Sequence, residues 1–292
     1  MTTHERWERL RNKIMTFTLI GFLIYVIGVF ATVRLSPEGY RLLLRSLPVL
    51  LGFAISFGFA IIVHELGHML MCRKVGVRVN NFSVGWGKRD LWKKKIGDTT
   101  YHITTLFFIG GSCDPDNSQF EAASSGKRIM VFLAGVFCNL LTAIFSMFIS
   151  ALLKGSSIVN ALITAVSSVP MVLGMIKDTI FSPEYLSSIL SHGSEMEAYK
   201  GLIMECATAS GLTQTFITVA AFSMVLNYLV LLFNLLPLPG LDGWQALTEC
   251  VQIVLKKHGK KPIPFAVLNK INSIGCSIFF IVNLLLMAWM FI

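Results

Sequence analysis

The chain has 292 residues, of which 54% are hydrophobic and only 14% are charged. This composition leaves too little polar surface for a soluble protein of that length and indicates an integral membrane protein. The formal net charge of +9 comes from basic residues beside apolar runs, which favours contact with anionic lipid headgroups and argues against a nucleic-acid partner.

Five apolar runs approach or exceed the roughly 20 residues that a helix needs to cross a bilayer. They cover residues 14–33, 46–71, 129–153, 212–236 and 271–292. The first run follows the charged tail "MTTHERWERLRNK", but it is long for a signal-peptide core and no A-x-A-like cleavage site follows it. We therefore expect a retained membrane anchor there.

Two polar segments lie between these runs. Residues 73–128 contain "VRVNNFSVGWGK" and "TTYHITTLFFIGG", which are rich in β-branched and aromatic residues and carry glycines near their ends. We expect a membrane-associated β-hairpin or small sheet at about 79–113. The second polar segment, about 177–211, mixes charges with short apolar stretches and could hold an amphipathic helix. It follows a weaker apolar run at 157–176 that carries Pro170 and Gly174, and the two belong to an outer-side segment at about 154–211.

The basic loops predict the orientation, because cytoplasmic loops are enriched in Lys and Arg. The basic N-terminus is expected in the cytosol, so 46–71 returns to the cytosolic side, 129–153 leaves it and 212–236 returns before "KKHGKK". This parity requires that 157–176 and its surroundings cross an even number of times, most simply zero. We therefore expect 157–176 at the outer interface or as a re-entrant piece packed on the outer side.

The predicted fold is an all-α polytopic membrane protein of about five transmembrane helices with a small β insert. Residues 1–45 form a cytosolic tail and an extra N-terminal helix, and residues 46–250 form a membrane core that includes the β insert and the outer-side segment. Residues 251–292 form a basic loop and a C-terminal transmembrane helix.

Three ionisable residues lie inside the second apolar run, in the motif "HELGH". His64 and His68 stand at positions i and i+4, on one face of a helix, where two imidazoles can bind one metal ion. Glu65 can reach a water at that metal, as in zinc hydrolases with the H-E-x-x-H motif. The alternative is a pair of satisfied core histidines with an incidental glutamate, which is disfavoured because ionisable residues in membrane segments are rare and usually functional.

A third protein ligand is needed, since catalytic zinc has three of them and an open position. The segment "FNLLPLPGLDGWQ" follows the run 212–236 and therefore lies on the same side as the histidines. Its only acid is Asp242, and Pro237 and Pro239 break the helix before it. Irregular backbone at membrane depth is tolerated where it is buried in protein or lines a cavity. Asp242 is therefore the predicted third ligand.

These motifs together resemble the site-2 protease family of intramembrane zinc metalloproteases. "HELGH" matches the family's H-E-x-x-H, and "NLLPLPGLDG" matches its N-x-x-P-x-x-x-L-D-G pattern. "FSVGWGK" followed by "FFIGG" resembles the β segment after the first catalytic helix, and "GVFCN", Gly135 to Asn139, resembles the family's G-x-x-x-N. The likeness covers about 46–250. It implies one Zn²⁺ per chain, held by His64, His68 and Asp242, with Glu65 as the general base.

The resemblance also implies residues that bind substrate. Asn234 would hold the substrate backbone, and Asn139, Gly110 and Gly111 are further candidates. Two alternatives remain open: Asn234 could cap a helix end, and Gly135 with Asn139 could simply allow close helix packing and one interhelical hydrogen bond. The β insert could add a substrate strand at an exposed edge or serve as a foot at the membrane surface.

The implied function is an intramembrane zinc metalloendopeptidase in a bacterial inner membrane. Its partners would be lipids and proteins with transmembrane or signal-peptide-like segments. Only about sixty residues separate the runs 129–153 and 212–236, too few for the PDZ domain of many bacterial relatives. The alternatives are a catalytically silent pseudoprotease that binds membrane peptides and a metal-coupled transporter, which would show inverted repeats and helix breaks in both halves.

Overall fold

The computed structural model describes residues 37–180 and 211–289. The elements in chain order are α2 (Pro37–Val75), β1 (Val79–Ile96), β2 (Thr99–Pro115), α3 (Asn117–Ala122), α4 (Ser125–Leu153), α5 (Ile158–Ile180), α8 (Leu212–Leu235), α9 (Asp242–Lys257) and α10 (Phe265–Trp289). The expected anchor at 14–33 lies outside the described residues, as does most of 177–211. The chain divides into two compact units, one covering Leu44–Leu235 and the other holding α9 and α10. Each is described by itself.

Three helices of the described residues are long and apolar enough to cross a membrane: Leu51–Val75 within α2, α4 and α8. They correspond to the predicted runs 46–71, 129–153 and 212–236. Residues 271–289 of the last predicted run lie in α10, which is not among these three. The prediction of a membrane protein is therefore supported by three spans, and the count of about five stays a prediction.

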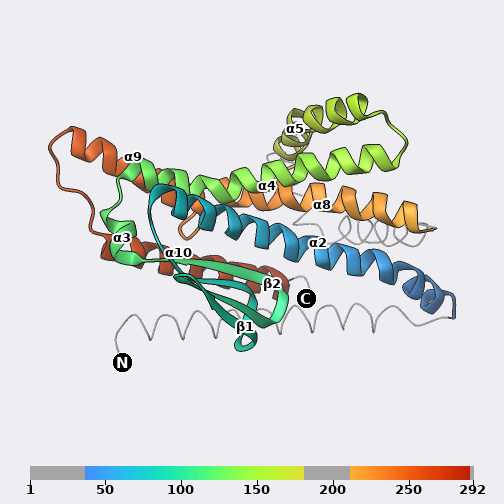
Figure 1. The fold of residues 1–292 in the computed structure, drawn as a ribbon, viewed down its shortest axis with the longest axis horizontal. Helices are drawn as coiled ribbons and strands as arrows, with labels where there is room; N and C mark the ends of the chain where they lie inside the picture. Colours follow the sequence, from blue (N-terminus) through green and yellow to red (C-terminus); the bar gives the residue numbers. More distant parts are fainter. Residues whose placement is uncertain (1–36, 181–210, 290–292) are drawn as a thin grey trace. The chain divides into compact units, whose positions relative to one another are not determined.

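The three spans lie side by side and alternate in direction (Figure 1). Gly67 of α2 faces Ala134 of α4, where a Cβ would come within 2.5 Å of the Ala134 carbonyl oxygen, so the missing side chain permits this approach. Ser146 of α4 bonds Ser223 of α8 at 3.0 Å. Because α4 runs antiparallel to both neighbours, the C-terminal ends of α2 and α8 lie on the same side.

The β insert is a small sheet in which both long strands bend, so that it has four segments. Residues 81–84 pair with 100–103 on one side and with 111–114 on the other, and residues 92–96 pair with 99–103. A cluster of buried apolar residues fixes the sheet to the ends of α2 and α4: Met69, Cys72, Val77, Val79, Phe82 and Val131. The segment 111–115 is thereby an edge of the sheet, next to α2.

Helix α5 packs against the bundle. The Ser168 hydroxyl lies 3.2 Å from the Tyr228 hydroxyl of α8, and Val169 contacts the buried cluster of Ala143, Met224 and Tyr228. Its apolar stretch Ile158–Met171 is shorter than the three spans. These contacts favour the packed piece over a helix that lies apart at the interface.

Candidate metal centre

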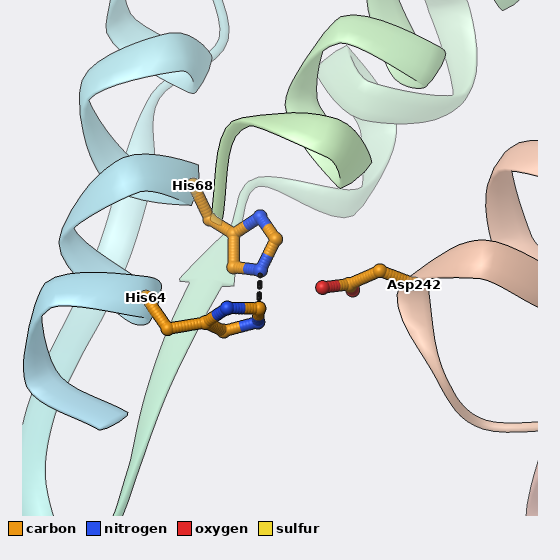
Figure 2. Close-up of side chains that lie close together, drawn as sticks. All are labelled: His64, His68 and Asp242. Atoms are coloured by element: carbon orange, nitrogen blue, oxygen red, sulfur yellow. Dashed lines mark hydrogen bonds between the residues drawn. The ribbon is translucent and has the colours of Figure 1, made fainter. Parts of the chain in front are cut away.

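The two histidines of "HELGH" lie on one face of α2, as their spacing predicts. His64 is 5% exposed, the ring centroids of His64 and His68 are 4.7 Å apart, and their Nε2 atoms face each other at 3.1 Å (Figure 2). The helix thus brings one nitrogen from each ring to the same point without any contribution from distant sequence.

Hydrogen bonds at the other ring nitrogens fix the tautomers. His68 Nδ1 donates to the carbonyl oxygen of Val131 at 2.8 Å, and His64 Nδ1 donates to Asn139 Oδ1 at 2.7 Å. A neutral imidazole that donates at Nδ1 carries a lone pair at Nε2. Two lone pairs that face each other at 3.1 Å repel, and a cation between them removes the repulsion. The pair therefore fits a metal ion, and zinc accepts imidazole and carboxylate ligands.

Gly135 of α4 lies directly against both rings. A Cβ there would lie 2.7 Å from His64 Cε1 and 2.7 Å from His68 Nε2. Distances below 3.0 Å are essentially never seen for real Cβ atoms, so any side chain would displace the imidazoles. The glycine of the G-x-x-x-N motif thus makes room for the two histidines.

Glu65 projects from α2 toward the edge of the sheet. Its Oε2 accepts a hydrogen bond from the main-chain N–H of Cys113 at 2.9 Å. Gly111 faces the same side chain, since a Cβ there would lie 3.1 Å from Glu65 Cγ, and Gly110 has a φ of 88°, which favours glycine. Gly111 therefore lets the edge strand approach the predicted general base.

The Cys113 thiol carries no charge at neutral pH, because its hydrogen bond to the Cys72 thiol and its burial raise its pKa well above the usual range. It therefore adds no negative charge next to the Glu65 carboxylate.

Asp242 belongs to the other unit and begins α9. It is 8% exposed, in the first turn after the N-cap residue Leu241. The predicted helix break is present, since α8 ends at Leu235 and Pro239 packs against Gly275 of α10. The end of the loop is therefore held in place by packing within its own unit.

One group of His, Cys, Asp and Glu side chains among the described residues could hold a metal ion, and it consists of His64, His68 and Asp242 (Figure 2). These are the three ligands that the two motifs predict.

The two asparagines named by the sequence have different surroundings. Asn139 is fully buried, and both N–H groups of its amide are used, by the Ala60 carbonyl and by Asn227 Oδ1, each at 2.9 Å. Asn139 therefore bonds His64 and two further groups on neighbouring helices, in line with the alternative of an interhelical hydrogen bond. Asn234 donates to the carbonyl oxygen of Val230 in its own helix at 2.9 Å.

Sequence reasoning missed three partners of the site. The Val131 carbonyl and the Cys113 N–H are main-chain groups, which leave no trace in residue identity. Asn227 did leave a signal, because it is an asparagine inside an apolar span, where polar side chains are rare and usually functional.

A family model described as peptidase family M50 matches residues 52–282. A candidate zinc metalloprotease of Chlamydia trachomatis is 39% identical over 111 residues, covering 32% of this chain and 18% of that protein. The regulator of sigma-E protease RseP of Escherichia coli is 33% identical over 109 residues, covering 33% of this chain and 24% of that protein. The chain thus matches a quarter or less of the length of either relative.

Proposed function

We propose, since the chain belongs to peptidase family M50, the site-2 protease family, that it is a zinc endopeptidase that cuts peptide bonds in or near membrane-spanning segments. The observation that carries the proposal is the pair of Nε2 atoms of His64 and His68, which face each other at 3.1 Å beside Glu65, inside an apolar span. Remnant signal peptides and anchors of membrane proteins are the substrate class, and a bacterial inner membrane with a cytosolic N-terminus is the proposed location.

One Zn²⁺ per chain would be held by His64, His68 and Asp242. Connectivity supports this set. His64 lies level with Asn227, because both bond Asn139, and the stretch from Asn227 to Leu235 rises about 12 Å along α8. The chain from Leu235 to Asp242 can span up to about 24 Å when extended. The loop is therefore long enough to turn back to the depth of the histidines.

Zinc, when bound, lowers the pKa of a coordinated water and polarises a carbonyl group. The chain's own contribution is the proton transfer: the Glu65 carboxylate takes the proton of the water that attacks the scissile carbonyl and passes it to the leaving amine. The main-chain N–H of Cys113 orients this carboxylate through a hydrogen bond of 2.9 Å to its Oε2.

A transmembrane substrate must first unwind, since its amides are tied in helical hydrogen bonds and unsatisfied groups in lipid cost several kcal/mol each. The edge segment 111–115 could supply hydrogen-bond partners to the unwound substrate. It lies beside Glu65, and an added substrate strand there would find main-chain partners next to the base.

The test is cleavage of a tagged transmembrane peptide by purified protein, with zinc measured in the same samples. Glu65→Gln is expected to keep one zinc per chain and to lose roughly 10²- to 10⁴-fold in cleavage rate, the usual size of a general-base contribution. His64→Ala and Asp242→Ala are expected to lose both zinc and cleavage.

Cleavage at the native rate by the Glu65→Gln protein would reject the assignment. A native protein that binds the peptide and zinc but never cuts would instead support the pseudoprotease alternative.

A further inference from the structure

A chain of hydrogen bonds crosses three helices behind His64. Asn139 of α4 donates to Asn227 Oδ1 of α8 at 2.9 Å, and Asn139 Oδ1 lies 2.7 Å from His64 Nδ1 of α2. Both asparagines are 0% exposed. Buried amides in apolar spans are costly unless their polar atoms find partners, so this chain is a specific feature rather than incidental polarity.

The bonds of Asn227 give the chain a direction. Its Nδ2 donates to the Ser223 carbonyl oxygen at 2.8 Å, which turns its Oδ1 toward α4. Asn139 must therefore donate to this oxygen from its Nδ2, which also donates to the Ala60 carbonyl oxygen at 2.9 Å. Asn139 therefore presents Oδ1 to His64, so the ring donates from Nδ1 and keeps Nε2 free of a proton.

The two histidines differ in the group that holds the ring proton on Nδ1. His68 donates to the main-chain carbonyl of Val131, which has no donor end. His64 faces an amide that has an acceptor end and a donor end. If the Asn139 amide turned round, its Nδ2 would face His64 and the ring would carry its proton on Nε2, the atom that a metal needs. Two acceptors that bond the Asn139 Nδ2 group prevent this turn: the Ala60 carbonyl oxygen and Asn227 Oδ1. Of these, only Asn227 Oδ1 belongs to a side chain and can be removed by substitution.

We propose that Asn227 is a positioning residue which, through Asn139, holds the proton of His64 on Nδ1 and so keeps Nε2 available to zinc. This inference rests on the proposed zinc role of His64. Groups that orient a metal ligand typically contribute 10- to 100-fold to metal affinity. Asn227 is expected to contribute within that range although it never touches the metal.

The experiment compares Asn227→Leu with Asn227→Asp in the full-length protein. Leu removes both polar atoms of the amide at similar size. Asp restores function, because a carboxyl group kept protonated by its apolar surroundings offers a carbonyl oxygen to Asn139 and an O–H to Ser223. Zinc affinity is measured by chelator competition. The His64 tautomer is read in metal-free protein from ¹⁵N signals of the imidazole.

The expected result is a 10- to 100-fold weaker zinc affinity for Asn227→Leu, with a larger share of the Nε2–H tautomer, and near-native values for Asn227→Asp. The matched control is Thr218→Val, since Thr218 is also buried in α8 but bonds only its own helix, at the Gln214 carbonyl. It is expected to leave both measurements unchanged.

A folded Asn227→Leu protein with native zinc affinity and native tautomer would overturn the proposal. If that variant does not fold, Asn227→Ala removes the same acceptor and the same two measurements decide. The proposed function fails separately, if His64→Ala binds zinc as tightly as the native protein does. In that case the tautomer measured without metal still decides the role of Asn227.

Discussion

Gly135 is the residue at which a single methyl group should matter most. Gly135→Ala would place a carbon 2.7 Å from atoms of both imidazoles, so one or both rings must move. We expect zinc affinity to fall at least tenfold and cleavage to fall with it, even though Ala favours a helix by about 1 kcal/mol over Gly. Zinc competition and peptide cleavage check this.

The matched control is Gly126→Ala, in the same helix, where a Cβ would meet nothing within 4 Å. That variant should bind zinc and cut peptide at native levels. Native zinc affinity in Gly135→Ala would show that the rings tolerate displacement and that the close packing has another purpose.

His64, Glu65 and His68 could be predicted because their relation is local. Their spacing along one helix decides which side chains share a face, so five letters carry the geometry. The partners at Nδ1 could not be predicted. Val131 and Asn139 come from another helix, and only packing decides which of its groups face each ring.

At the scale of elements, the edge of the sheet supports Glu65 through a main-chain group. Cys113→Pro removes the N–H that bonds Glu65. That N–H points away from β1, so the strand pairing should survive. We expect at least a tenfold loss of cleavage with zinc still bound, measured as rate and metal content on one preparation.

Cys113→Ala is the control, because it removes the same thiol but keeps the N–H. Equal cleavage rates in the Pro and Ala variants would count against a role of this N–H.

The strands of the β insert could be located from β-branched and aromatic residues with glycines near their ends. The pairing of four segments could not, since the bends that let residues 81–84 bond on both sides depend on the cluster that fixes the sheet to α2 and α4. The sequence likewise leaves the packing of α5 between two alternatives, because its apolar pattern alone does not state which surface it covers.

At the scale of the whole molecule, the alternation of α2, α4 and α8 fixes which loops share a side. Ser156, after α4, should face the outside, and Arg78, after α2, should face the cytosol. Single cysteines are placed at these positions in a background without native cysteines and treated with an impermeant maleimide. The cysteine at Ser156 should react only in intact spheroplasts, and the cysteine at Arg78 should react only in inverted vesicles. Labelling of both from one side would contradict this topology.

The sequence by itself determined the membrane environment, the three described spans, the helix break after α8 and the identities of the proposed ligands. These follow from composition and from short spacings, which covalent geometry carries. Only the tertiary structure decided that Gly135 makes room for the rings, that Cys113 bonds Glu65 and that Asn227 reaches His64 through Asn139. These contacts join residues distant in the chain, and close packing of side chains, rather than local pattern, selects them.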